Sequence, residues 1–304
     1  MTASTAYADW IAVDWGTSNL RAWAMRADGT VLDEAASEDG MGALNPDQFE
    51  PALLRLIDRW LGVGPTPVMA CGMVGSRQGM CEAPYVEVPA QPRNLDPVLV
   101  PNTDPRISIR IVPGLKQVSP PDVMRGEETQ IAGFIAENPK FDGILCLPGT
   151  HTKWVEISAG EVVSFRTFMT GELYTLLGEQ SVLQHALEGG WDVSAFGDAV
   201  NETLSKPENL AARLFSIRAD HLLNATDGAT AKSRLSGYLI GAELAAARPY
   251  WLGQEIAIIG SEDMISVYSE ALKLQGLMPK TVVSDHVTRA GLRALSQSWS
   301  EAAE

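Results

Sequence analysis

The sequence contains few of the residues that build disulfide frameworks or structural metal sites. Its three cysteines, Cys71, Cys81 and Cys146, are too few for such a framework, and its four scattered histidines suggest no zinc site. These shortages exclude secreted disulfide-rich domains and zinc modules, and they favour a reducing cytoplasm. No apolar run approaches the roughly 20 residues that a membrane-spanning helix needs. The first ten residues also lack the basic and apolar segments of a signal peptide.

Positive charge is scarce as well. The chain has 23 Lys and Arg against 38 Asp and Glu, which gives a formal net charge of -15. Such an acidic chain is not expected to bind nucleic acid. An anionic small molecule would need local basic residues, and four lie beside glycine-containing motifs: Arg21, Arg77, Arg125 and Lys153. With 304 residues, 45% of them hydrophobic, the chain can bury two cores.

A polar turn near the start of the chain lies between two predicted strands, at residues 11–13 and 20–25. Gly16 lets the main chain approach a ligand closely, and successive N–H groups in such a turn can bind an anion. Asp14 ends the first strand and is a candidate ligand for Mg²⁺, which takes one or two carboxylates together with phosphate oxygens. Alone, the pattern fits an ordinary hairpin with a polar turn equally well.

The same hairpin pattern occurs a second time, at residues 143–165. The residues Gly16, Thr17, Arg21 and Trp23 of the first copy have counterparts in Gly149, Thr150, Lys153 and Trp154. The second turn has no counterpart of the acidic residue Asp14. Two copies of a strand, phosphate turn and strand predict two like-folded domains that face each other across a nucleotide.

A third turn follows the apolar strand predicted at residues 255–259. Gly260 and Ser261 end this strand and open a helix. A glycine here removes the side chain that would block a flat base or ribose. The alternative is a simple tight turn.

These motifs resemble those of a known superfamily. DWGTSNLRAW, LPGTHTKW and IIGSED are similar to the two phosphate motifs and the adenosine motif of the sugar kinase/Hsp70/actin superfamily. ACGMVGSRQG, EAPYVEVPA, DVMRGEETQIAGF, CLPGTHTKW and FMTGELYTLL look like the 2-dehydro-3-deoxygalactonokinase family, over nearly the whole chain. The resemblance implies ATP-dependent phosphorylation of the terminal hydroxyl of 2-dehydro-3-deoxy-D-galactonate to the 6-phosphate, in galactonate and galactose catabolism.

The fold that we expect is a two-domain α/β protein of the actin-like ATPase class, with the nucleotide in the interdomain cleft. The first lobe would span residues 1–118, a connecting helix 119–142, and the second lobe 143–304. Mg²⁺ would bind Asp14. The residues expected to contact ATP are Gly16, Thr17, Ser18, Asn19, Arg21, Gly149, Thr150, His151, Lys153, Gly260 and Ser261.

The loop at residues 72–79 and the segment after it are expected to form the pocket for the sugar acid. The residues expected to line it are Gly72, Met73, Ser76, Arg77, Tyr85 and Arg125. Because arginine recognises carboxylates, Arg77 is expected to pair with the substrate carboxylate. The alternative for Arg77 is a solvated loop charge.

Phosphorylation of a hydroxyl needs a carboxylate that accepts its proton. Asp122, Glu127 and Glu128 are the candidates, just before and at the start of a predicted helix. Acids also favour helix N-termini for electrostatic reasons alone. Residues 126–128 are similar to a catalytic glutamate motif of the exopolyphosphatase branch, which ranks Glu128 and Glu127 above Asp122.

Two other functions remain open at this point. One is a phosphatase or nucleoside triphosphate hydrolase on the same fold, and the other is a non-catalytic nucleotide or sugar sensor. The expected partners are ATP and a sugar acid, with no nucleic acid and no membrane, and a homo-oligomer is possible. The sequence does not determine which epimer of the sugar acid is preferred.

Overall fold

The structure, a computed structural model, describes residues 7–302. The chain forms two compact units. The first contains the residues up to 141, residues 159–163 and those from 285 onward, and the second contains residues 142–158 and 164–284. The first unit therefore includes the helix that was expected to connect two lobes, α2 (Glu127–Glu137), and nearly all of the last helix, α9 (Ser284–Ala302).

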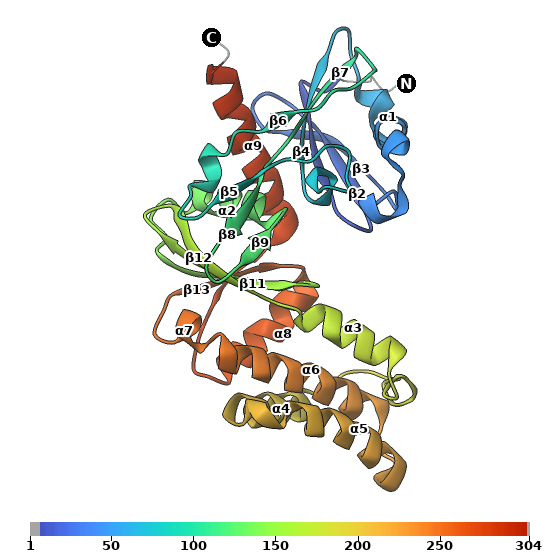
Figure 1. Ribbon diagram of the computed structural model, residues 1–304, viewed down its shortest axis with the longest axis vertical. Helices are drawn as coiled ribbons and strands as arrows, with labels where there is room; N and C mark the ends of the chain where they lie inside the picture. The colour runs from blue at the N-terminus through green and yellow to red at the C-terminus, as the bar shows by residue number, and fades with distance from the viewer. Residues whose placement is uncertain (1–6, 303–304) are drawn as a thin grey trace. The chain divides into compact units, whose positions relative to one another are not determined.

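The first unit is built on a six-stranded sheet with the order β3-β2-β1-β4-β7-β6 (Figure 1). The strands are β1 (Trp10–Trp15), β2 (Leu20–Met25), β3 (Val31–Ser37), β4 (Thr66–Cys71), β6 (Val98–Leu99) and β7 (Ile107–Ile111). Strands β1, β4 and β7 are parallel, whereas β2 and β3 are antiparallel. The helix α1 (Phe49–Ile57) buries its apolar face, and Phe49 meets Trp15 edge to face at 5.5 Å.

A small second sheet precedes α2. It has the order β5-β8-β9, with β5 (Tyr85–Glu87), β8 (Gly114–Gln117) and β9 (Asp122–Met124). This sheet fixes the ends of two segments that matter below, because Tyr85 begins β5 and Arg125 follows β9 directly.

The second unit repeats the topology of the first. Its five-stranded sheet has the order β12-β11-β10-β13-β14, in which β10 and β11 are antiparallel while β10, β13 and β14 are parallel. The strands are β10 (Gly143–Leu147), β11 (Thr152–Ser158), β12 (Glu161–Phe168), β13 (Ile256–Gly260) and β14 (Lys280–Val283). This order matches β3-β2-β1-β4-β7, strand for strand.

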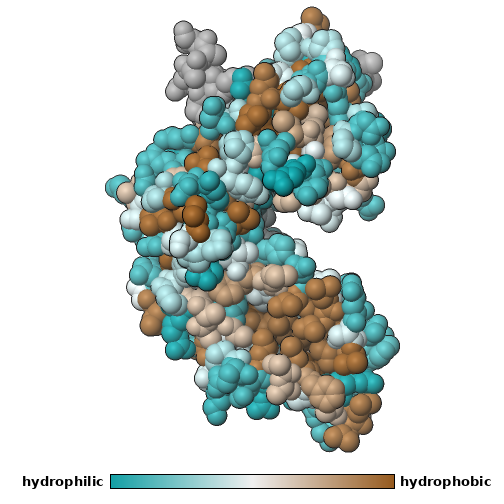
Figure 2. Space-filling view, viewed as in Figure 1, coloured by the Kyte–Doolittle hydropathy of each residue, from teal (hydrophilic) through white to brown (hydrophobic). Residues whose placement is uncertain are grey.

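Helices complete the second unit. They are α3 (Thr170–Gln180), α4 (Val193–Ser205), α5 (Leu210–Asn224), α6 (Gly228–Ala246), α7 (Arg248–Trp251) and α8 (Glu262–Lys273). Figure 1 shows α4 and α6 running side by side. Apolar surface gathers on one face of this unit (Figure 2). Leu173 and Leu176 of α3 and Phe215 of α5 are among the exposed apolar side chains of the unit.

Short 3₁₀ helices occur in the connections of both units. They are η1 (Met41–Ala43), η2 (Pro46–Gln48), η3 (Asp58–Trp60), η4 (Met73–Gly75), η5 (Pro92–Asn94), η6 (Gln184–Ala186) and η7 (Pro207–Asn209). Among the residues that the structure describes, no helix is both long and apolar enough to cross a membrane.

Candidate active site

The first phosphate turn joins β1 to β2, and a neighbouring loop holds it in place. Thr17, Ser18 and Asn19 are exposed at its tip. The backbone N–H groups of Met41 and Gly42 donate to the carbonyl oxygens of Gly16 and Thr17, each at 2.9 Å. A Cβ on Gly40 would lie 2.3 Å from the Thr17 carbonyl oxygen, so only glycine fits there. The sequence analysis did not predict this bracing contact.

Asp14 and Arg21 face each other across the first hairpin. They are directly paired in the β1–β2 register, and Arg21 Nη2 lies 2.6 Å from Asp14 Oδ2. Arg21 Nη1 also lies 2.5 Å from Asp285 Oδ1, at the start of α9. Burial raises the pKa of Asp14, and Arg21 opposes this rise. Arg21 therefore neutralises acids of its own unit. Its contact with Asp285, 264 residues away in sequence, was not predicted from the sequence.

The loop at residues 72–79 and the start of α2 lie beside Asp14. Because β1 and β4 are adjacent and parallel, their carboxyl ends meet at one sheet edge. A Cβ on Gly72, which has a φ of +95°, would lie 3.4 Å from Asp14 Oδ1. A Cβ on Gly126 would lie 3.3 Å from the Gly72 Cα. The fold thus brings the metal candidate, the expected sugar-acid loop and the start of α2 together within the first unit.

The three base candidates differ in exposure. Glu128 is fully buried, and its two oxygens accept hydrogen bonds from the Gly126 N–H at 2.7 Å and the Thr129 hydroxyl at 3.1 Å. Burial, and then the neighbouring Glu127 charge, raises the pKa of Glu128 to about 8. Glu127 is partly exposed, with Oε2 3.1 Å from the Arg125 N–H. Asp122 lies on β9, where its Oδ1 accepts from the Val123 N–H. Glu127 is therefore the acid at the start of α2 that a substrate can reach.

The basic residues expected to hold the sugar acid also differ. The Arg77 side chain is 81% exposed and lies 3.5 Å from Glu82. Arg125 is buried and stacks on the Tyr85 ring, with its Cζ 4.3 Å from the ring centroid. The structure thus places Arg77 at the surface and Arg125 inside the first unit.

In the second unit, the second phosphate turn and the Gly260–Ser261 turn lie at one sheet edge. This follows from the parallel pairing of β10 with β13. A Cβ on Gly260 would lie 3.2 Å from Pro148 Cγ. The Ser261 hydroxyl accepts from the Met264 N–H at 3.4 Å and caps α8. Two of the three sequence motifs are therefore neighbours in space.

The second turn is tied to the start of α3. The Glu172 N–H donates to the Thr150 carbonyl oxygen at 2.9 Å, and His151 Nε2 lies 2.6 Å from Glu172 Oε2. Lys153 is buried, and its Nζ donates to the His151 carbonyl oxygen at 3.1 Å. Lys153 thus supports the backbone of the turn.

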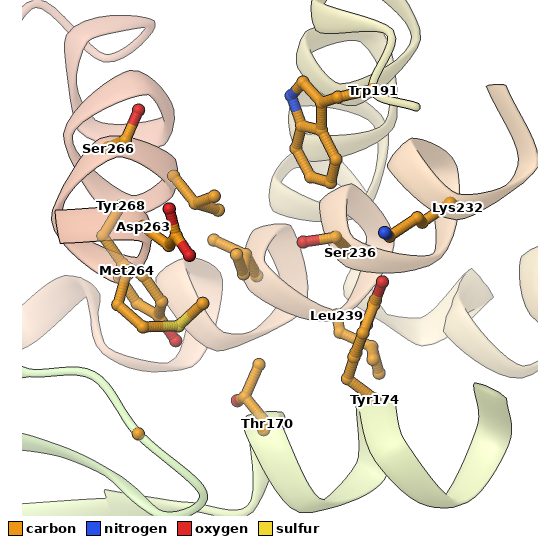
Figure 3. A pocket seen from close by; sticks show the side chains of 14 residues that line it. Thr170, Tyr174, Trp191, Lys232, Ser236, Leu239, Asp263, Met264, Ser266 and Tyr268 are labelled. Carbon is orange, nitrogen blue, oxygen red and sulfur yellow. The ribbon is translucent and has the colours of Figure 1, made fainter. Parts of the chain in front are cut away.

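A cavity of about 410 Å³ opens beside this turn, within the second unit. Side chains from α3, α6 and α8 surround it, with Trp191 on one side (Figure 3). Its lining residues are Gly149, Thr170, Gly171, Tyr174, Trp191, Lys232, Ser236, Leu239, Ile240, Asp263, Met264, Ser266, Val267 and Tyr268. An apolar lining with a few polar groups is typical of a small-molecule site. Of these lining residues, the sequence analysis expected only Gly149 to contact ATP.

A buried glutamate links the walls of this cavity. Glu243 of α6 accepts hydrogen bonds from Trp154 Nε1 at 2.8 Å, from the Tyr268 hydroxyl at 3.0 Å and from the Thr170 hydroxyl. Burial raises the pKa of Glu243 to about 7, and the three hydrogen bonds oppose this rise. Thr170 and Tyr268 line the cavity, so Glu243 fixes α3 and α8 against β11.

Comparison with known proteins identifies the family. The sequence profile of the 2-keto-3-deoxy-galactonokinase family matches residues 14–295. The chain belongs to this family. It is 39% identical to a probable 2-dehydro-3-deoxygalactonokinase of Rhizobium meliloti, over 98% of this chain and 99% of that protein. It is 36% identical to the 2-dehydro-3-deoxygalactonokinase of Escherichia coli, over 96% and 98%. The family predicted from the sequence motifs is therefore confirmed, and with it the class of enzyme, a kinase.

Solved structures confirm the fold. The crystal structure of a putative 2-dehydro-3-deoxygalactonokinase from Sinorhizobium meliloti is 38% identical and aligns with a TM-score of 0.90, over 95% of this chain and 99% of that one. The ADPNP-bound activator of 2-hydroxyisocaproyl-CoA dehydratase from Clostridium difficile is 11% identical and aligns with a TM-score of 0.50, over 96% and 97%. The second likeness concerns the fold alone, which is the predicted actin-like ATPase fold.

Proposed function

We propose that this member of the 2-keto-3-deoxy-galactonokinase family transfers the γ-phosphoryl group of ATP to the terminal hydroxyl of 2-dehydro-3-deoxy-D-galactonate. The product is the 6-phosphate, an intermediate of galactonate and galactose catabolism. The observation that carries the proposal is the family match over residues 14–295. The two phosphate hairpins support it, because phosphoryl transfer depends on positioning and on stabilising phosphate charge. A family of kinases also favours a sugar-acid acceptor over the hydrolase and sensor alternatives.

ATP has proposed contacts in each unit. Its adenosine part fits the cavity of about 410 Å³, where Trp191 and Tyr174 offer aromatic faces. The proposed phosphate contacts are the turn at residues 16–19, Arg21, the turn at 149–151, and the start of α8 at Gly260 and Ser261. Lys153 contributes by holding the second turn in place.

Mg²⁺ is the proposed metal, and Asp14 is its proposed ligand. The residues present fit this ion, because Asp14 supplies a hard carboxylate oxygen at the strand end beside the first turn. Cys71, whose Sγ lies 4.0 Å from Asp14 Oδ1, does not offer a competing thiolate, since burial raises the pKa of its thiol well above its ordinary value. When bound, the ion would offset negative charge on the phosphate oxygens.

Glu127 is the proposed base. The sequence ranks Glu128 first, but contact with the hydroxyl is the first requirement for proton transfer. Glu128 is fully buried and its oxygens hold the turn that opens α2, whereas Glu127 is partly exposed. Glu127 would accept the proton of the terminal hydroxyl, and Glu128 would hold the backbone that carries Glu127.

The remaining predictions concern partners and location. ATP and the sugar acid are the proposed small-molecule partners, and a homo-oligomer remains a prediction. The cytoplasm is the proposed location, because ATP is the donor and the three cysteines are unpaired.

A screen of ADP release against a panel of sugar acids, including the C4 epimer, tests the proposal. We expect ADP release that requires 2-dehydro-3-deoxy-D-galactonate, with the phosphate of the product on its terminal carbon. Phosphate release without any sugar acid would establish a hydrolase instead. Binding of both ligands without turnover would establish a sensor.

A further inference from the structure

Arg125 is a buried cation whose hydrogen-bonding capacity is mostly unused. Its side chain donates from Nη2 to the Ala83 carbonyl oxygen at 2.8 Å. Its Nε and Nη1 are buried and have no hydrogen-bond partner among residues 7–302. The residue as a whole is only 8% exposed. A buried charge with unmade hydrogen bonds is costly, so such a group needs a specific reason to be there.

Among the residues that the structure describes, no carboxylate forms a hydrogen bond with the Arg125 guanidinium. Burial raises the pKa of Glu128, the nearby acid, to about 8 and favours its neutral form, although the charge of Arg125 opposes this rise. Glu127 accepts from the backbone N–H of Arg125. The other arginine of this site, Arg21, has two carboxylates. The positive charge of Arg125 is thus available to a ligand.

The surroundings of Arg125 form a small site on the loop at residues 72–79. A Cβ on Gly75 would lie 2.9 Å from Arg125 Nη1, so the backbone of this glycine packs directly against the guanidinium. The next residue, Ser76, is 6% exposed, and its hydroxyl also has no partner within the described chain. The Tyr85 ring covers one face of the guanidinium and is itself 36% exposed. The unpaired Nη1 of Arg125 therefore lies against Gly75, the residue before Ser76.

We infer that Arg125, assisted by Ser76, binds the carboxylate of the acceptor substrate and is the residue that selects an acid over a neutral sugar. The inference rests on the proposed function. It assigns recognition of the substrate carboxylate to Arg125, in place of Arg77. Arg77, at 81% side-chain exposure and beside Glu82, gains little from an ion pair that water screens. Because the free donors are covered, entry of the carboxylate requires the exposed Tyr85 ring to shift.

The test compares Arg125→Met with Arg77→Met and with Lys116→Met, a matched loss of charge on the neighbouring strand β8. For each variant, KM is measured for ATP, for 2-dehydro-3-deoxy-D-galactonate and for its C1 carboxamide. We expect Arg125→Met to raise the KM of the acid by about 10- to 100-fold and to leave the KM of ATP within about twofold. The preference for the acid over the carboxamide should also disappear. Lys116→Met should behave as the wild type.

Thermal unfolding separates a binding role from a structural one. Without ligand, Arg125→Met should be at least as stable as the wild type, since it removes a buried unpaired charge. The upward shift of the wild-type Tm by the sugar acid should be lost in Arg125→Met and reduced in Ser76→Ala. Should Arg125→Met fail to fold, Ser76→Ala must still raise the KM of the acid alone.

Two results would overturn the inference: an acid preference that survives Arg125→Met, or a larger effect at Arg77 than at Arg125. Equal increases in both KM values would also overturn it. These outcomes are distinct from failure of the proposed function, in which the wild type itself phosphorylates no sugar acid. Even then, a rise in Tm on addition of the sugar acid, present in the wild type and absent in Arg125→Met, would show that Arg125 binds the carboxylate.

Discussion

Replacing Glu127 with Gln should separate binding from chemistry. The change keeps the size of the side chain and an acceptor for the Arg125 N–H, which now lies 3.1 Å from Glu127 Oε2. It removes the group that would accept the hydroxyl proton. We expect the KM values of both substrates to stay within about threefold, while kcat falls by about 10²- to 10⁴-fold, the usual contribution of a general base.

Glu128→Gln is the matched control, and the pKa of Glu128 indicates how small its effect on kcat should be. The pKa of about 8 stands above the ordinary 4.5, a difference that corresponds to about 5 kcal/mol against the ionised form. Glu128 is therefore mostly protonated at pH 7, and its Oε1 accepts a hydrogen bond from the Thr129 hydroxyl. The amide of Gln can reproduce this arrangement, so kcat at pH 7 should stay within about threefold of the wild type.

Steady-state kinetics of purified variants at pH 6 to 9, with circular dichroism as the check on folding, decide between the two acids. A dead Glu128→Gln beside an active Glu127→Gln would show that the buried acid is the base after all. If both variants are active and Asp122→Asn is dead, neither glutamate accepts the proton. Loss of substrate binding in Glu127→Gln would make that residue a binding group and refute the reasoning.

The other predictions concern pH, the metal and packing. The folded protein keeps a proton on Glu128 that the unfolded chain releases above pH 4.5, so stability should fall as pH rises from about 4.5 to about 8, and urea unfolding should show that Glu128→Gln loses this part of the dependence. Asp14→Asn should fold but lose most turnover across a Mg²⁺ titration, and near-normal turnover at limiting Mg²⁺ would remove Asp14 from the metal site. Glu243→Gln should keep the KM for ATP within about threefold, whereas Glu243→Leu should raise it at least tenfold. Only Gln can still form hydrogen bonds with Trp154 and with the hydroxyls of Thr170 and Tyr268. Equal KM values in the two variants would contradict a role of Glu243 in shaping the cavity. Gly40→Ala should lower the Tm by several degrees and weaken ATP binding, since its Cβ would lie 2.3 Å from the first turn, and an unchanged Tm would show that the loop moves aside.

The elements that could be predicted from the sequence are those fixed by local pattern. A short apolar run before Asp14 and another before Pro148 could only be buried strands, and the glycine-containing turns after them had to be tight. The duplication of these hairpins then predicted two like-folded domains, because like sequences bury their apolar faces in like ways. The family motifs added the identity of the fold, which strand patterns alone do not specify.

The interactions that could not be predicted join residues far apart in the chain. Asp285 contacts Arg21 and Glu243 contacts Trp154, over separations of 264 and 89 residues. Nothing in the local pattern of either acid distinguishes it from a solvated charge. The sequence also does not distinguish Glu128 from Glu127, because burial at a helix start depends on what packs over it.

The net charge of -15 raises the question of how an acidic protein binds two anions. The residues of the first unit suggest that its local charge is much smaller than its composition implies. Asp14 is paired with Arg21, and Glu128 is uncharged at neutral pH. The guanidinium of Arg125 has no hydrogen bond to a carboxylate among the described residues. Since a charge at a distance is screened by salt while a buried one is not, the buried groups determine what binds, and the acidic surface has little influence on it.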